Sequence, residues 1–237
     1  MPSQIDLQIT GRIQNLIFYK RGDKYYARSV PGKVKQTNAT KKRATEFGQA
    51  SRLGKSLRAQ LLPAIPFPSD NKMQTRLVSA LFQWLRSGFD AAQPNSEVPF
   101  VSTYSFTEGY TVRERWKVAL QVTKPDEGGL QLTIPAFVPA RSISAPAGTI
   151  KVKCIIAATS SKVGNAITAG GFSTSLEFDL NDKEVPEQLI SLPLPTTAGN
   201  LVVTAISLEY FSFKNGLLQR TTNKAFMPAG VVSAMYF

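Results

Sequence analysis

Strict alternation of apolar and polar residues in the second half of the sequence restricts the possible folds more than any other feature. The clearest runs are 116–123 and 176–180, where every second residue is apolar. A period of two is typical of half-buried antiparallel strands. The other runs that predict strands, separated by Pro and Gly turns, are Leu130–Ile134, Ile150–Ala157, Gln188–Leu194, Leu201–Phe213 and Val231–Phe237.

These runs favour one architecture for residues 98–237. About seven or eight strands with no helical period between them are typical of an antiparallel β-sandwich, of the immunoglobulin-like or jelly-roll kind. The Asn215-Gly216 pair predicts a tight hairpin turn after the longest strand, because both residues accept positive φ.

Two amphipathic helices are predicted before this domain. The first runs from about Thr40 to Leu61 and the second from about Asn71 to Gly88, with prolines between them. Each has one apolar stripe, so the two helices are expected to pack as a helical hairpin. The stripe residues are Phe47, Ala50, Leu53, Leu57 and Leu61 in the first helix, and Leu77, Leu81, Trp84 and Leu85 in the second.

The N-terminal residues read as a small basic β unit. Strands are predicted at Leu7–Ile13, Leu16–Lys20 and Lys24–Val30, with a turn at Arg21-Gly22-Asp23. The whole chain is therefore expected to be α+β, mainly β. Its predicted parts are a basic β-hairpin arm and linker (1–38), a helical hairpin (39–97) and a β-sandwich domain (98–237).

Positive charge is concentrated in the first quarter of the sequence. Residues 1–60 hold 13 of the 28 Lys and Arg but only 3 of the 16 Asp and Glu, so this segment has net charge +10 (13 minus 3) and the remainder only +2 (15 minus 13). Such asymmetry indicates contact with nucleic acid or with an acidic partner surface. The candidate binding residues are Lys20, Arg21, Lys24, Arg28, Lys33, Lys35, Lys41, Lys42, Arg43, Arg52, Lys55 and Arg58.

Two local patterns support this interpretation. Three cations, Lys41 to Arg43, follow the expected helix N-cap Thr40, where the helix dipole disfavours positive charge. An anion or acidic surface would stabilise them there, and solvation by water explains them equally well. Aromatic and basic residues also interleave in 18–21 and 24–28, a mixture that can bind phosphates and stack bases.

Catalytic and metal chemistry have little support. The chain has no histidine, which excludes Ser-His-Asp and Cys-His nucleophiles. Its single cysteine, Cys154, lies in a predicted strand and is expected to be buried and unreactive. The carboxylates fall mainly in turns, and no glycine pair has the spacing of a phosphate-binding loop. No enzymatic activity, cofactor or metal site is predicted.

No run of about 18 apolar residues is long enough to span a bilayer, and the first residues lack the order of a Sec signal peptide. The sequence therefore favours a protein that is cytoplasmic or part of a particle.

Residues 11–51 combine three segments: Gly-x-Ile-x-Asn-Leu-Ile-Phe-Tyr, Gly-Asp-Lys-Tyr-Tyr-Ala-Arg-Ser-Val-Pro and Asn-Ala-Thr-Lys-Lys-Arg-Ala-Thr-Glu-Phe-Gly-Gln-Ala-Ser. This stretch resembles a group of bacterial and phage-associated proteins that pair a basic arm and helix with a C-terminal sandwich. Where that group has Thr-x-x-Gln before the helix, this chain has Thr40-Lys-Lys-Arg43. The resemblance implies the same architecture and brings no catalytic residue with it.

Together these features predict a non-enzymatic structural protein that self-assembles into a homo-oligomeric shell, tube or filament. The basic arm would reach a neighbouring subunit or an enclosed nucleic acid, and the sandwich would supply side-to-side contacts. The alternative is a nucleic-acid-binding or ribosome-associated protein that uses the basic N-terminal segment. A carbohydrate-binding or surface-binding module has weaker support, because no aromatic cluster can be placed on one face of the sandwich.

Overall fold

The computed structural model describes residues 9–32, 35–66, 70, 72–87, 96–109, 111–125, 129–164 and 167–237. The chain forms two compact units, Met1–Lys42 and Arg43–Phe237. Each unit is described by itself below.

The first unit contains a three-stranded antiparallel sheet with the order β1-β2-β3. Gly22, at φ +62°, and Asp23 form the turn between β2 and β3, and Arg21 pairs with Lys24 on either side of it. The predicted turn and the two strands that flank it are confirmed. The strands are β1 Gly11–Ile13, β2 Leu16–Arg21 and β3 Lys24–Ser29.

Helix α1 (Asn38–Gln60) begins earlier than the sequence predicts. Thr37, not Thr40, caps it, because the Thr37 hydroxyl accepts the backbone N–H of Thr40 at 3.2 Å. Lys41 to Arg43 consequently lie in the second helical turn, where the dipole acts more weakly on exposed charge. The three cations are therefore less unfavourable than the sequence suggested.

The second unit consists of helices and two antiparallel sheets. Its other helices are η1 Leu62–Ala64, α2 Met73–Arg86, α3 Pro99–Ser102, α4 Val112–Arg115, α5 Pro139–Ser142 and η2 Lys224–Phe226. Its strands are β4 Ser96–Glu97, β5 Gln121–Thr123, β6 Leu130–Ile134, β7 Thr149–Lys162, β8 Ile167–Asp179, β9 Gln188–Leu192, β10 Asn200–Lys214, β11 Leu217–Arg220 and β12 Ala229–Tyr236.

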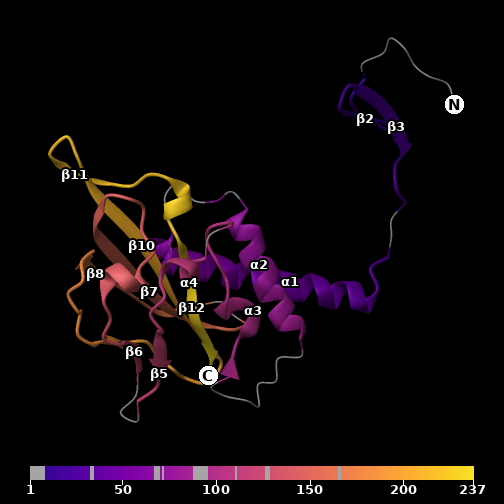
Figure 1. Ribbon diagram of the computed structural model, residues 1–237. Helices are drawn as coiled ribbons and strands as arrows, with labels where there is room; N and C mark the ends of the chain where they lie inside the picture. The colour runs from indigo at the N-terminus through magenta and orange to yellow at the C-terminus, as the bar shows by residue number, and fades with distance from the viewer. Residues whose placement is uncertain are drawn as a thin grey trace. The chain divides into compact units, whose positions relative to one another are not determined.

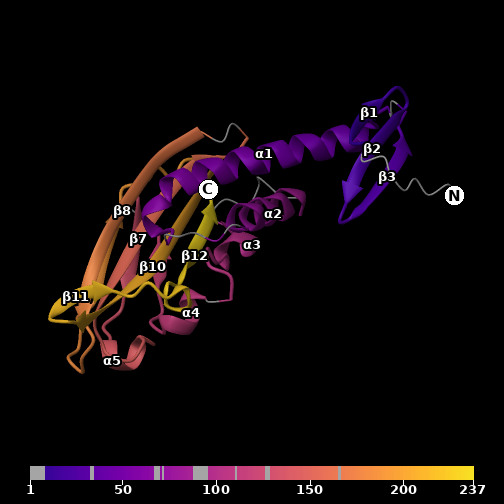
Figure 2. The same cartoon turned by 90° about the horizontal axis from the view of Figure 1, so that it is seen from above.

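The larger sheet lies between two other layers. Its strand order is β4-β12-β10-β7-β8, and β11 also pairs with β10. Helices α1 and α2 cover part of one face (Figures 1 and 2), and the smaller sheet, β5-β6-β9, packs on the opposite face. Strands β7 and β10 are therefore buried from both sides along much of their length, which explains their long apolar runs.

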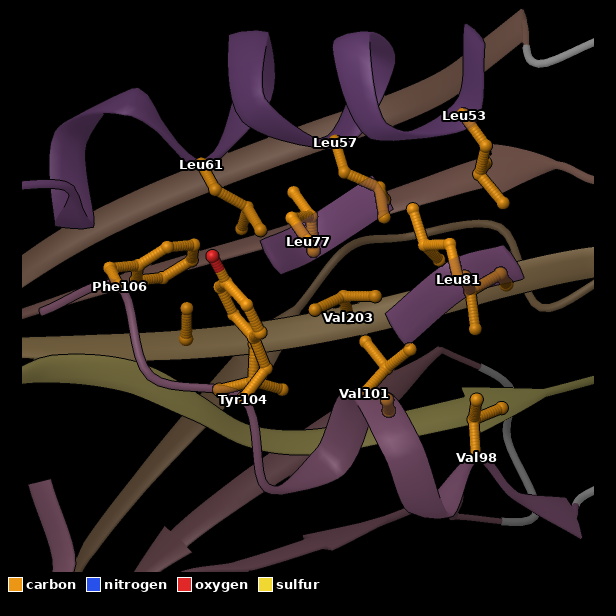
Figure 3. Close-up of a cluster of buried hydrophobic side chains, with 14 of the residues drawn as sticks. Leu53, Leu57, Leu61, Leu77, Leu81, Val98, Val101, Tyr104, Phe106 and Val203 are labelled. Carbon is orange, nitrogen blue, oxygen red and sulfur yellow. The ribbon is translucent and has the colours of Figure 1, made fainter. Parts of the chain in front are cut away.

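The first hydrophobic core lies between the helices and the larger sheet. In Figure 3, Leu53 and Leu57 of α1 and Leu61, the residue directly after α1, point toward Leu77 and Leu81 of α2. Ala157, Val203 and Ala205 close this core from the sheet. The spacing of three and four residues in both helices correctly predicted most of these stripes, although Leu85 is only partly buried. Phe47 is a correction: it was expected on the buried stripe of the first helix, but it is 54% exposed and its ring contacts that of Phe82 edge-on at 5.8 Å.

Small and polar groups fix the position of α1. A Cβ atom at Gly54 would lie 3.2 Å from Val78 Cγ2, so the glycine allows α2 to approach α1 closely. The hydroxyls of Ser56 and Ser161 form a hydrogen bond of 3.3 Å between α1 and β7. The helical pair and the sheet consequently share one core.

The second core joins the two sheets. Leu132 and Leu192 of the smaller sheet pack with Val152, Ile156 and Ile206 of the larger one, and all five side chains are fully buried. The fold is therefore α+β, mainly β, with a helical pair and antiparallel sheets as predicted, and no closed barrel forms among the described residues. The immunoglobulin-like or jelly-roll type of the sandwich and the domain boundaries at 38 and 97 stay predictions.

The strand predicted at 116–123 is mostly wrong. Only Gln121–Thr123 forms a strand, β5. Thr111 caps α4 immediately before this stretch, and Trp116 makes only an isolated bridge to Ile143. Trp116 packs against Phe137 and Phe178. Val118, Leu120 and Val122 are partly buried against the same core while the residues between them are exposed, which produces the alternation without a continuous ladder.

A glycine in β12 allows the backbone before α4 to approach the sheet closely. A Cβ atom at Gly230 would lie 3.0 Å from the carbonyl oxygen of Tyr104, which accepts the backbone N–H of Val231. Gly230→Val is therefore expected to lower the free energy of unfolding by about 1–3 kcal/mol. Urea denaturation measures the change. Gly48→Ala is the control, because nothing lies within 4 Å of that Cβ position in α1 and the change should raise stability by about 0.5–1 kcal/mol.

Candidate basic interface

The N-terminal sheet has two chemically different faces, which follow from its pairing register. Residues directly opposite each other in paired strands share a face. The apolar face carries the side chains of Ile13, Leu16, Phe18, Tyr25 and Ala27, together with one cation, Lys20. The basic-aromatic face carries those of Arg12, Ile17, Tyr19, Arg21, Lys24, Tyr26 and Arg28.

On the basic-aromatic face, two tyrosines stack across the β2–β3 pair. The ring centroids of Tyr19 and Tyr26 are 5.7 Å apart with an interplanar angle of 23°. The guanidinium carbon of Arg28 lies 5.6 Å from the centroid of Tyr19, a cation–π contact. The result is an exposed aromatic platform with a cation against it.

The apolar face is equally exposed. Ile13 and Leu16 are 51% and 45% accessible. No residue described between 9 and 32 is buried, although the segment is rich in apolar and aromatic side chains. A unit of fewer than about 40 residues with no buried side chain usually needs further contacts to be stable. Another surface packed on the apolar face would supply such contacts.

The other predicted binding residues follow the sheet in sequence, and none of those that the structure describes is buried. Lys35 precedes α1 and is exposed, whereas Lys33 lies outside the described residues. Six more are placed on α1: Lys41, Lys42, Arg43, Arg52, Lys55 and Arg58.

The arginines of α1 have partners within the chain. Arg43 lies 4.0 Å from a carboxylate oxygen of Glu46, Arg52 Nε donates to the carbonyl of Gly48 at 3.4 Å, and Arg58 donates to the side chain of Gln74. These contacts tie the arginines to α1 and α2. The N-terminal sheet therefore gives the clearest grouping of predicted cations.

The structure places the predicted cations of the sheet on two different faces, and it shows one further cation on the basic-aromatic face. Arg21, Lys24 and Arg28 gather on the basic-aromatic face, whereas Lys20 lies on the apolar face with its ammonium 5.6 Å from the centroid of Tyr25. Arg12 pairs with Ile17 and joins the basic-aromatic face, and the sequence prediction missed it. The short turn between β1 and β2 was the signal that could have placed it.

Other described residues bear on metal binding, thiol chemistry and small-ligand pockets. No group of three or more His, Cys, Asp or Glu is placed to hold a metal among them. Cys154 is buried in β7, and burial raises the pKa of its thiol to about 12. Two surface pockets of about 310 and 320 Å³ flank Trp116 and the end of β8, respectively. Within the described part of the chain, no helix is sufficiently long and apolar to cross a bilayer.

Searches against protein-family models, curated proteins and solved structures gave no match for this chain. The functional argument consequently rests on its own residues.

Proposed function

We propose that this protein is a non-enzymatic structural protein that self-assembles into a homo-oligomer, such as a shell, tube or filament. The observation that carries the proposal is the N-terminal sheet, in which no described residue is buried although one face is apolar. Covering that face would contribute about 1 kcal/mol for each half-exposed apolar side chain. A second copy of this chain is the proposed occupant.

The second unit offers apolar surface for such a contact. The β10–β11 hairpin ends in an Asn215-Gly216 turn, and its cross-strand pair Phe213 and Leu218 is 63% and 46% exposed. Soluble monomers seldom leave paired large apolar side chains on a hairpin tip. The apolar face of the N-terminal sheet of one copy is therefore proposed to pack against Phe213 and Leu218 of another copy.

Strand β8 supports side-to-side contacts of the sandwich. It pairs with β7 on one side, and among the described residues no strand pairs with its other edge. Natural proteins usually protect long edge strands with prolines, bulges or inward charges. β8 has 13 residues and no proline, and its ladder with β7 has one irregularity, between Gly170 and Thr168. The rest of this edge offers backbone N–H and C=O groups with which a strand of a neighbouring subunit could pair.

The test of self-assembly is the molar mass in solution, measured by size-exclusion chromatography with light scattering. The full chain should be oligomeric, whereas removal of residues 1–36, which keeps the Thr37 cap of α1, should reduce the oligomer to smaller species. Leu16→Asp on the apolar face should act in the same direction, and Lys24→Gln on the opposite face is the matched control. A strictly monomeric full chain at high concentration, or an oligomer unchanged by both alterations, would contradict the proposal.

Nucleic-acid binding or ribosome association is the second candidate function. The observation that favours it is the basic-aromatic face, which holds four cations and two exposed tyrosines. This candidate needs only the N-terminal sheet and does not depend on assembly.

A further inference from the structure

We propose that the basic-aromatic face of the N-terminal sheet is a binding site for single-stranded nucleic acid. Bases would stack on Tyr19 and Tyr26, and the phosphates would lie along the cations on either side. The inference rests on the second candidate function. It specifies which face of the sheet binds, which class of nucleic acid is bound and which residues make the contacts.

The side chains on this face form three rows. Arg12, Ile17 and Arg28 make the first row, the tyrosine pair makes the second, and Arg21 and Lys24 make the third. Successive rows are about 7 Å apart, because each lies two residues further along the strands. The aromatic platform consequently lies between two cationic rows separated by about 14 Å.

The charges on this face are all of one sign. The sheet contains one acidic residue, Asp23, and it lies in the β2–β3 turn rather than in a strand. None of the described ion pairs involves Arg12, Arg21, Lys24 or Arg28. The guanidinium of Arg12 donates from Nε to the carbonyl of Gln14 at 3.0 Å, and this bond leaves its terminal nitrogens for a phosphate.

The tyrosines decide between a single strand and other polyanions. Tyr19 and Tyr26 are 39% and 42% exposed, so part of the platform remains open after the two rings stack on each other. Unpaired bases can stack on such rings, whereas the bases of a duplex are already stacked and enclosed. An acidic protein surface would pair with the cations but would not require two exposed aromatic rings. Single-stranded DNA or RNA satisfies both features.

The test is fluorescence anisotropy of a labelled twelve-residue oligothymidylate with the full chain at low salt. Tyr26→Thr keeps a β-forming residue but removes the ring, and it should weaken binding about tenfold. Tyr26→Phe keeps the ring and should bind within about twofold of the wild type. Arg21→Gln should reduce the slope of log affinity against log salt by about 0.7. Lys20→Gln, which removes a cation from the apolar face, is the matched control and should change neither quantity.

Heparin, a polyanion without bases, separates stacking from charge. Its affinity should be unchanged by Tyr26→Thr and reduced by Arg21→Gln. The inference is overturned if oligothymidylate does not bind at 50 mM salt, if Tyr26→Thr weakens heparin and oligothymidylate equally, or if Lys20→Gln acts like Arg21→Gln. A monomeric chain that binds oligothymidylate as expected would contradict self-assembly alone, and an oligomer that does not bind would contradict this inference alone.

Discussion

Leu57→Ala is expected to lower the free energy of unfolding of the second unit by about 2–5 kcal/mol, because it leaves a cavity in the core between α1 and the larger sheet. Leu57 is fully buried and points toward the leucines of α2 (Figure 3). Urea denaturation followed by circular dichroism measures the effect. Leu62→Ala is the matched control, since Leu62 is 64% exposed and its truncation should change stability by less than about 0.5 kcal/mol.

The same experiment on the second core tests whether the three layers unfold together. Leu132 of β6 is also fully buried, between the two sheets. Leu132→Ala should therefore also lower the free energy of unfolding by about 2–5 kcal/mol. Both variants should keep a single unfolding transition with an unchanged m value. Two separate transitions in either variant would show that the helical layer and the smaller sheet unfold independently.

Above about pH 9, the free energy of unfolding of the second unit should fall as the pH rises. Cys154 should be the first group to cause this fall. Burial raises the pKa of this thiol from its ordinary 9.0 to about 12 in the folded chain. Below pH 9 the thiol is neutral in both states. Above it, the unfolded chain releases the proton and the folded chain retains it, so the free energy of unfolding falls by about 1.4 kcal/mol per pH unit. By pH 12 the loss is about 4 kcal/mol.

Cys154→Ala separates this contribution from those of buried tyrosines. Burial also raises the pKa of Tyr104, from its ordinary 10.0 to about 12. Ionisation of Tyr104 in the unfolded chain therefore lowers the free energy of unfolding only above about pH 10. The variant should have a flat stability profile between pH 9 and 10, where the wild type already declines. Urea denaturation across this range is the measurement. Equal slopes in the two proteins, or rapid reaction of the native thiol with a thiol reagent at pH 8, would contradict the buried position of Cys154.

The sequence predicted those parts of the fold that short-range patterns determine. The Gly22-Asp23 turn fixed the register of β2 and β3, and the leucine stripes identified the buried faces of α1 and α2. The order of strands in the larger sheet could not be predicted, because a period of two reveals which side chains share a face but not which strand lies beside another. Thr37 was missed as a cap because Thr40 offers the same chemistry three residues later.

The candidate site was only partly predictable for the same reason. Interleaved cations and aromatics pointed to residues 18–28 as a binding segment, and that stays a prediction, but adjacent residues of a strand point to opposite faces. Lys20 and Arg21 are neighbours in sequence and lie on different faces, whereas Arg12 and Arg28 lie on the same face although 16 residues separate them. Only the pairing of three strands shows which cations can act together.

The position of β12 has a consequence for how the chain is made. This strand lies between β4 and β10, so Ser96 pairs with Tyr236 and Glu97 pairs with Met235. During synthesis, about 140 residues must follow Glu97 before its partner exists. Until then, β10 presents an unpaired edge to other nascent chains. The larger sheet can therefore be completed only after translation has passed residue 236, and chaperone protection in that interval would favour the native pairing over pairing between chains.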